Sequence, residues 1–127
     1  MRAITQMLHR TRAVSLVIFG DMFHAKSSLS RNSLEQLQTF RQQHPKLRIK
    51  LVLGNHDQPL GTLSASWGID IVPAEVFADG LAIGHEPDNI QQGAALMLCG
   101  HLHPAVRLTS VNDQNCRLPY FWWHKNV

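Results

Sequence analysis

Several short apolar runs in the chain end at a glycine that polar side chains follow directly. The run Leu51 to Leu53 stops at Gly54, and Asn55-His56-Asp57 comes next. Consecutive apolar positions are typical of a strand buried on both faces, as in a parallel sheet covered by helices. Ligands of such sheets collect outside the carboxyl ends of the strands, where these polar residues would lie. Taken alone, the stretch also fits a plain polar turn.

The segment before this run completes a βαβ unit. Residues 14–19 are apolar and β-rich, which predicts a first strand, and residues 47–53 predict a second. Between them, Asn32 and Glu35 have the spacing of a capping box, so a helix is predicted over 33–43. The two strands should be parallel, with a right-handed crossover. The polar residues after each strand then emerge at one edge of the sheet.

The remaining elements follow from the same periodicities. A helix over 1–13 has no Ser, Thr, Asp or Asn to cap its start. Further along we expect a helical turn near 64–67, a strand at 69–72, a hairpin around Asp79-Gly80, a buried strand at 94–99 and a last hairpin over 106–123. The aromatic run Tyr120 to Trp123 should pack in the core of that last strand, with stacking on nucleic-acid bases as the alternative. The basic stretch from Arg41 to Lys50 favours a solvated sheet edge over a phosphate-backbone contact.

Composition limits the function classes. With 127 residues and 44% hydrophobic content, the chain predicts one soluble globular domain over 1–127. No apolar run is long enough for a membrane span and no secretory signal is evident, so we expect a cytoplasmic protein. The net charge of +3 gives only weak support for an anionic partner. Cys99 and Cys116 lack Cys-x-x-Cys spacing, which argues against a disulfide framework or a structural zinc site.

Four predicted strands end in glycine followed by residues that commonly bind metals. They are Gly20-Asp21, Gly54-Asn55-His56-Asp57, Gly84-His85 and Gly100-His101-Leu102-His103. Glycine allows the backbone to turn sharply and leaves space beside a bound ion or phosphate. Carboxylate, carboxamide and imidazole suit borderline divalent cations such as Mn²⁺, Fe²⁺ and Zn²⁺, and the motifs contain no cysteine thiolate. A divalent-metal site is therefore expected at the shared sheet edge.

These motifs, in this order, resemble those of the calcineurin-like metallophosphoesterases. Within that superfamily, His85-Glu86-Pro87, Gly100 to Leu108 and Leu118 to Trp122 look like the bacterial DNA ligase-associated branch, a group of DNA damage response endonucleases. The resemblance covers about Leu16 to Trp123. It implies an α/β fold, a four-layer α/β/β/α sandwich that would be incomplete here.

The resemblance also implies roles for individual residues. The metal ligands would be Asp21, Asn55, His85, His101 and His103. Asp21 would bridge two ions, His56 would be the general acid at the leaving oxygen, and Asp57 would orient the His56 ring. The implied reaction is hydrolysis of phosphodiester bonds, in DNA and linked to DNA repair, by a metal-activated hydroxide. Mn²⁺ is the first expectation, with Fe²⁺ or Zn²⁺ as alternatives, and a DNA ligase or helicase would be the protein partner.

The chain departs from the family pattern at its start. No Asp-x-His motif occurs in it, although that motif supplies two ligands of the second metal site in the family. We therefore expect a chain truncated at the N-terminus, and at the C-terminus before a closing strand. One metal site would keep four ligands, while the other would keep only Asp21 and His103. This chain could therefore bind one ion instead of the two that the family binds. Two other functions stay open: a catalytically impaired metal- or nucleic-acid-binding remnant, and a phosphomonoesterase or nucleotide pyrophosphatase.

Overall fold

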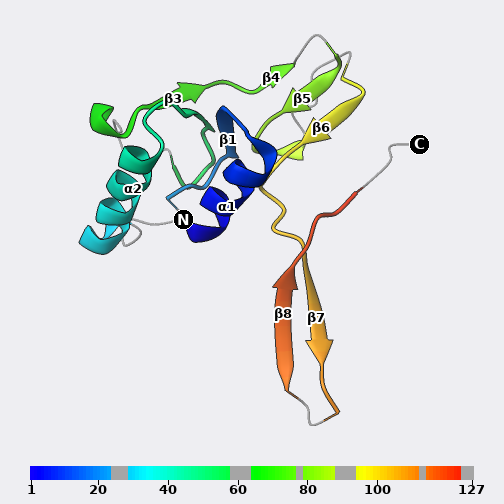
Figure 1. Cartoon of the computed structure of the whole chain (residues 1–127). Coiled ribbons are helices and arrows are strands. Elements are labelled where there is room, and N and C mark those ends of the chain that lie inside the picture. The colour runs from blue at the N-terminus through cyan, green and yellow to red at the C-terminus, as the bar shows by residue number, and fades with distance from the viewer. Residues whose placement is uncertain (24–28, 58–63, 77–78, 88–93, 112–113, 124–127) are drawn as a thin grey trace.

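The computed structural model describes residues 1–23, 29–57, 64–76, 79–87, 94–111 and 114–123 (Figure 1). Its elements in chain order are α1 (Arg2–Thr11), β1 (Ser15–Phe19), α2 (Arg31–Gln43), β2 (Arg48–Val52), the 3-10 helix η3 (Ala65–Trp67), β3 (Ile69–Val72), β4 (Glu75–Val76), β5 (Leu81–Ile83), β6 (Leu96–Leu98), β7 (Ala105–Thr109) and β8 (Asn115–Pro119). Helices and strands alternate in the first half of the chain. The expected α/β class is confirmed.

The first sheet has the order β1-β2-β3 and is parallel throughout. Its core forms where Leu8 of α1 and Phe40 of α2 pack on Ile49 of the central strand β2. Leu51, also on β2, is fully buried at 0% exposure. The βαβ unit predicted from the apolar runs is therefore confirmed, with both polar clusters leaving the sheet at the same edge.

The start of α2 differs from the prediction. Ser30, not Asn32, is the N-cap: its hydroxyl oxygen accepts a hydrogen bond from the Ser33 amide at 3.3 Å. Asn32 lies inside the helix and accepts from the Gln36 side chain, while Glu35 pairs with Arg31 one turn earlier. Ser and Asn are almost equally good caps, so the spacing of Asn32 and Glu35 could not decide which residue starts the helix.

Two polar side chains near the end of α2 connect elements. The Arg41 guanidinium donates to the Leu47 carbonyl at 2.6 Å and to the Pro45 carbonyl at 3.1 Å. It therefore closes the turn between α2 and β2, and is not simply a charge at a solvated sheet edge. The His44 ring packs against Phe40, with ring centroids 4.8 Å apart, and its Nε2 lies 3.4 Å from the Thr5 hydroxyl of α1.

The second sheet has the order β4-β5-β6. Strands β4 and β5 pair antiparallel across Asp79-Gly80, which confirms the predicted hairpin, and β6 adds parallel to β5. The predicted strand 94–99 is shorter than expected and is not fully buried, because Leu98 is 40% exposed. Both α-helices of the described residues precede β3 and pack on the first sheet, so the four-layer arrangement stays a prediction.

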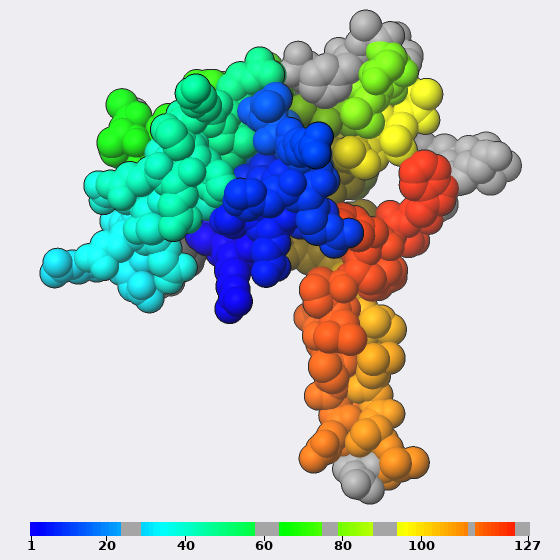
Figure 2. Space-filling model, viewed as in Figure 1, coloured from blue at the N-terminus to red at the C-terminus, as the bar shows by residue number. Residues whose placement is uncertain are grey.

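The last two strands, β7 and β8, form an antiparallel hairpin that projects from the body of the molecule (Figures 1 and 2). The hairpin itself was predicted, but the position of the aromatic residues after it was wrong. Strand β8 ends at Pro119, and Tyr120, Trp122 and Trp123 follow it with exposures of 48%, 58% and 71%. Proline has no N–H for a ladder bond, so the strand ends before the rings instead of placing them in a core.

Among the described residues, no helix is long and apolar enough to cross a membrane.

Candidate metal centre

The candidate site forms where the carboxyl ends of β1 and β2, in the first sheet, meet those of β5 and β6, in the second sheet. His85, which follows β5, lies within hydrogen-bond distance of the last residue of β1: its Nδ1 is 2.8 Å from the Phe19 carbonyl oxygen. The amides of Gly100 and His101, beyond β6, donate to the His85 carbonyl at 3.1 and 3.0 Å. Residues far apart in the sequence are therefore fixed around one imidazole ring.

The Phe19 carbonyl also fixes the role of each nitrogen of His85. A carbonyl oxygen only accepts, so Nδ1 carries a proton and, in the neutral ring, Nε2 presents its lone pair. That nitrogen lies 3.0 Å from Asn55 Oδ1, 3.1 Å from His101 Nδ1 and 3.6 Å from Asp21 Oδ2. Backbone carbonyls that orient a ligand histidine in this way are a common feature of metal sites.

The distances from His85 Nε2 to its three neighbours fit a shared cation. Ligand atoms of Asp21, His85 and His101 all lie within 4.8 Å of one another. A divalent ion about 2.1 Å from each nitrogen or oxygen holds its ligands at most ~4.2 Å apart. The pair distances to His85 of 3.0 to 3.6 Å satisfy that limit. Because oxygen and imidazole nitrogen lone pairs face one another here, a positive charge at their centre would stabilise the arrangement.

Asp21 is held in a conformation that few residues adopt. Its φ is +52°, in the left-handed region, and it follows Gly20 with φ +81°. One carboxylate oxygen, Oδ1, accepts from the His56 amide at 3.1 Å. The other, Oδ2, lies 3.6 Å from His85 Nε2 and 3.8 Å from His103 Nε2. A non-glycine residue in this region is a sign of local strain, and such strain concentrates at functional sites.

His103 lies at the edge of this group. Its side chain is 59% exposed, whereas those of Asp21 and His85 are 7% and 6% exposed. Like Asp21, it has a left-handed backbone, with φ +44°. The structure therefore brings all five predicted ligand positions to one place, with Asn55, His101 and Asp21 around the His85 Nε2 atom and His103 across the Asp21 carboxylate.

His56 and Asp57 lie beside the cluster on the loop after β2. Asp57 is buried, and its two carboxylate oxygens accept from the amides of Phe23 and Gly54, each at 3.0 Å. These bonds tie the loop after β2 to the loop after β1. His56 is exposed, and its amide is the donor to Asp21. The structure thus gives Asp57 a loop-bracing position, while its predicted orientation of the His56 ring stays a prediction.

Two glycines make this close approach sterically feasible. A Cβ at Gly54 would overlap the Asp21 carboxylate and backbone amide, and a Cβ at Gly20 would overlap the His85 ring. The sequence predicted that glycine leaves space beside a bound ion or phosphate, and the structure shows a different use of that space at both positions. The space that they leave is occupied by the ligand side chains themselves.

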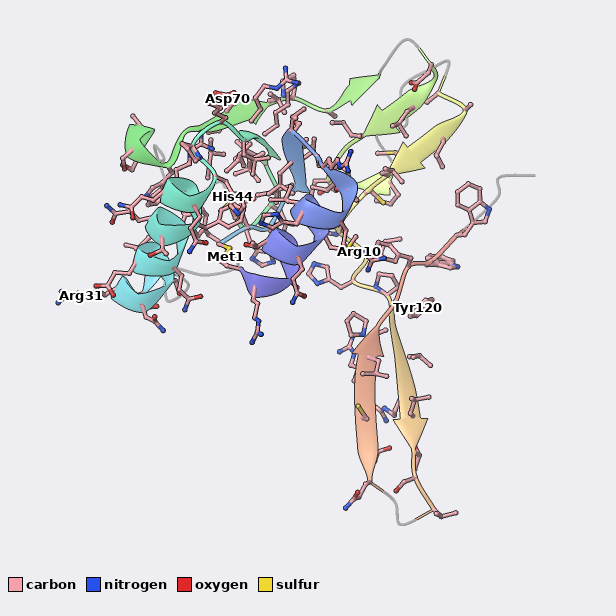
Figure 3. The ribbon with its side chains drawn as sticks, in the orientation of Figure 1. Met1, Arg10, Arg31, His44, Asp70 and Tyr120 are labelled. Carbon is pink, nitrogen blue, oxygen red and sulfur yellow. The ribbon has the colours of Figure 1, made fainter. Side chains whose placement is uncertain are left out.

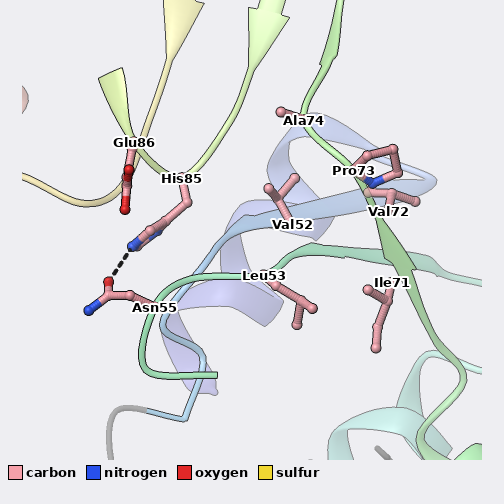
Figure 4. Close-up of a pocket in the computed structure, with 9 residues that line it drawn as sticks. All are labelled: Val52, Leu53, Asn55, Ile71, Val72, Pro73, Ala74, His85 and Glu86. Atoms are coloured by element: carbon pink, nitrogen blue, oxygen red, sulfur yellow. Dashed lines mark hydrogen bonds between the residues drawn. The ribbon is translucent and has the colours of Figure 1, made fainter. Parts of the chain in front are cut away.

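A cavity of about 530 Å³ opens beside the cluster (Figure 4). Asn55 and His85, joined by their 3.0 Å contact, lie at one side with Glu86, while the opposite wall is apolar and includes Leu53, Ile71 and Pro73. Sequence reasoning gave Glu86 no role, although it belongs to the His85-Glu86-Pro87 motif. The cavity offers an apolar wall and a carboxylate directly next to the candidate ligands.

The fold resembles a solved nuclease. The crystal structure of Pseudomonas putida nuclease MPE superimposes with a TM-score of 0.75 at 28% sequence identity, over 93% of this chain and 56% of that chain. The chain thus spans little more than half the length of the nuclease that it matches. No protein-family model matches the chain, and no curated protein matches it by sequence.

The site and the similarity agree on a coarse function. A nuclease neighbour favours a hydrolase of the nuclease or phosphoesterase type, and the group of Asp21, His85 and His101 favours a bound divalent metal.

Proposed function

We propose that the protein is a metal-dependent phosphoesterase that hydrolyses phosphodiester bonds, with DNA as its substrate and Mn²⁺ as its cation. The observation that carries the proposal is the convergence of Asn55, His101 and Asp21 on His85 Nε2 at 3.0 to 3.6 Å. The similarity to a nuclease supports the phosphodiester substrate. A role in DNA repair beside a DNA ligase or helicase belongs to the same proposal.

Each residue of the cluster has a defined task in this reaction. Asp21, Asn55, His85 and His101 hold the cation, and His103 contacts the outer side of Asp21. A bound divalent cation polarises phosphoryl oxygens and lowers the pKa of coordinated water. His56, exposed beside Asp21, donates a proton to the departing oxygen, and Asp57 fixes the loop that carries His56. General acid catalysis of this kind contributes roughly 10²–10⁴-fold.

Hydrolysis of bis(p-nitrophenyl) phosphate with added Mn²⁺ tests the assignment. Asn55→Ala should lower the rate by at least about tenfold, since metal-site substitutions commonly cost that much. Asn32→Ala on the exposed face of α2 is its control. A wild-type chain without turnover, or an Asn55→Ala rate equal to the parent, would contradict the proposal. Rates on the monoester p-nitrophenyl phosphate separate a phosphodiesterase from a phosphomonoesterase.

The leaving group tests His56 separately. A p-nitrophenolate ion departs with little need of a proton, whereas the alkoxide of a dinucleotide needs one. His56→Ala should therefore slow dinucleotide cleavage much more than cleavage of the p-nitrophenyl ester. The exposed His9, on α1, provides the control His9→Ala. An equal loss on both substrates would remove the general-acid role and leave a positioning role.

A single-ion protein without turnover is the second candidate. A second ion would have only Asp21, shared with the first site, and His103 as ligands among the described residues, and the sequence has no Asp-x-His motif. Elemental analysis after Mn²⁺ loading distinguishes the two functions. One ion per chain with no turnover favours this candidate, and two ions with turnover exclude it.

A further inference from the structure

We infer that the hairpin β7–β8 and the aromatic segment after it form a binding arm for single-stranded nucleic acid. Here the arm means Arg107, Arg117 and the run Tyr120 to Trp123. The inference rests on the proposed function, because it names the form of substrate that the metal centre would receive. Its evidence is separate: charge, exposure and register on an element that projects from the body (Figure 2).

The first observation is a pair of like charges across the hairpin. In the β7–β8 register, Arg107 lies directly opposite Arg117, so both guanidiniums leave the same face. Both residues are exposed. Like charges directly opposite one another destabilise an antiparallel pair. The sequence from Ala105 to Trp123 has these two arginines and one acidic residue, Asp113, so its net charge is +1. An anionic partner would relieve the repulsion between the paired arginines.

The second observation is the row of exposed rings that continues from β8. Tyr120 is 48% exposed, Trp122 58% and Trp123 71%, in a stretch without helix or strand. Figure 3 places Tyr120 at the base of the hairpin, and its amide donates to the Pro104 carbonyl at 3.1 Å. Exposed aromatic side chains beside arginines are the combination on which bases stack and phosphates bind in single-strand binders.

The third observation is continuity with the metal centre. His103, whose Nε2 lies 3.8 Å from Asp21, is two residues before β7 begins. Arg107 is four residues beyond His103, a separation of at most ~14 Å along an extended chain. A strand with one phosphate at the metal centre therefore reaches Arg107 within a few nucleotides. The rings start at the base of the hairpin, on the side of the body.

The strand register also argues that the arginine face binds nucleic acid and does not bind a second copy of the chain. Val106 pairs with Leu118 and Leu108 with Cys116, so these residues occupy the face opposite the arginines. A dimer through that apolar face would leave the two guanidiniums unneutralised. The charge of the arginine face selects a polyanion, and the adjoining rings select bases over carboxylates.

Binding is tested on the whole chain with a fluorescent 20-nucleotide DNA strand in EDTA, which prevents hydrolysis. The double variant Arg107→Ala/Arg117→Ala should weaken binding at least tenfold. It should also lower the slope of log K against log salt by about 1.4, the value for two phosphate contacts on a single strand. Its hydrolysis of bis(p-nitrophenyl) phosphate should equal that of the parent. Removing two repelling charges should not unfold the hairpin.

Matched variants locate the effect. Arg2→Ala/Arg10→Ala removes the same charge from exposed positions on α1 and should change binding less than twofold. Arg107→Lys/Arg117→Lys should retain part of the affinity, because charge remains and the planar guanidinium is lost. Trp123→Ala should weaken binding about fivefold or more, because the inference places a base on its ring.

Each other result overturns the inference. Equal binding by the parent and the arm variants would assign the strand to another surface. Displacement of the DNA by polyglutamate at equal charge concentration would show a site for acidic protein, and tighter binding of a duplex would exclude the single-strand assignment. Because binding is measured without metal, a failure here leaves the phosphoesterase proposal standing. A chain that binds the strand but hydrolyses no diester refutes that proposal alone.

Discussion

The body of the molecule and the β7–β8 hairpin are built in opposite ways. In the body, Leu51 and Ile49 of β2 are 0% and 2% exposed, and side chains distant in sequence surround them. Every residue of β8 is exposed, and the hairpin is held by its own cross-strand pairs. A lone two-stranded hairpin is marginally stable in water. The body therefore carries the stability that fixes the metal centre, while the hairpin leaves most of its side chains exposed.

The largest expected effect comes from truncating a leucine side chain in each of the two regions. Leu51→Ala should lower the free energy of unfolding by about 2–5 kcal/mol, because it leaves a cavity in the central strand of the first sheet. Leu108→Ala, at a residue already 50% exposed, should cost no more than about 0.5 kcal/mol. Urea denaturation measures both. Equal losses would show that the hairpin is packed as tightly as the body.

A second test concerns the brace between two loops of the metal centre. Asp57→Asn places an amide hydrogen against one of the two backbone N–H groups that the carboxylate now accepts. The expected loss of unfolding free energy is about 1–3 kcal/mol, the cost of an unsatisfied buried donor. Asp70→Asn, at an exposed position of β3, is the control. If Asp57→Asn leaves stability unchanged, the brace has no energetic role.

A smaller effect is expected where a side chain caps a helix. Ser30→Ala removes the oxygen that accepts from the Ser33 amide at the start of α2 and should cost about 1 kcal/mol. In the hairpin, Thr109→Ala removes a 2.7 Å hydrogen bond to the Asn115 side chain, but water replaces it. That change should stay within about 0.5 kcal/mol. Thermal unfolding of the two variants gives the comparison, and a larger loss for Thr109→Ala would reverse it.

The smallest expected effect is a difference in the rate at which the two cysteines are alkylated. Burial raises the pKa of the Cys99 thiol, so less of the reactive thiolate is present at a given pH. Cys116 lies on the exposed hairpin. Near pH 8, iodoacetamide should therefore modify Cys116 several-fold faster than Cys99, and mass spectrometry of the digested chain measures both rates. Raising the pH should narrow the gap, because the Cys99 thiolate population then increases.

Much of the body could be predicted from residue order alone. Consecutive apolar residues required buried parallel strands, and glycine after each strand placed Asp21, Asn55 and His85 at one edge. The contact between Phe19 and His85 could not be predicted, because it depends on how two sheets face each other across 66 residues. The N-cap of α2 was missed because two adequate caps lie close together. The aromatic residues were misplaced because an apolar composition does not say whether a ring packs inside or meets a partner.

The crowding at Gly20 and Gly54 also limits which sequences this site can use. Most positions of a protein accept several residues, so a random library recovers mixtures there. At these two positions every other residue adds a Cβ where Asp21 and His85 already lie. A library randomised at residues 20 and 54 and selected for metal retention should return glycine at both. Selection should therefore remove substitutions at these two positions early, even though neither glycine has a side chain that could bind a ligand.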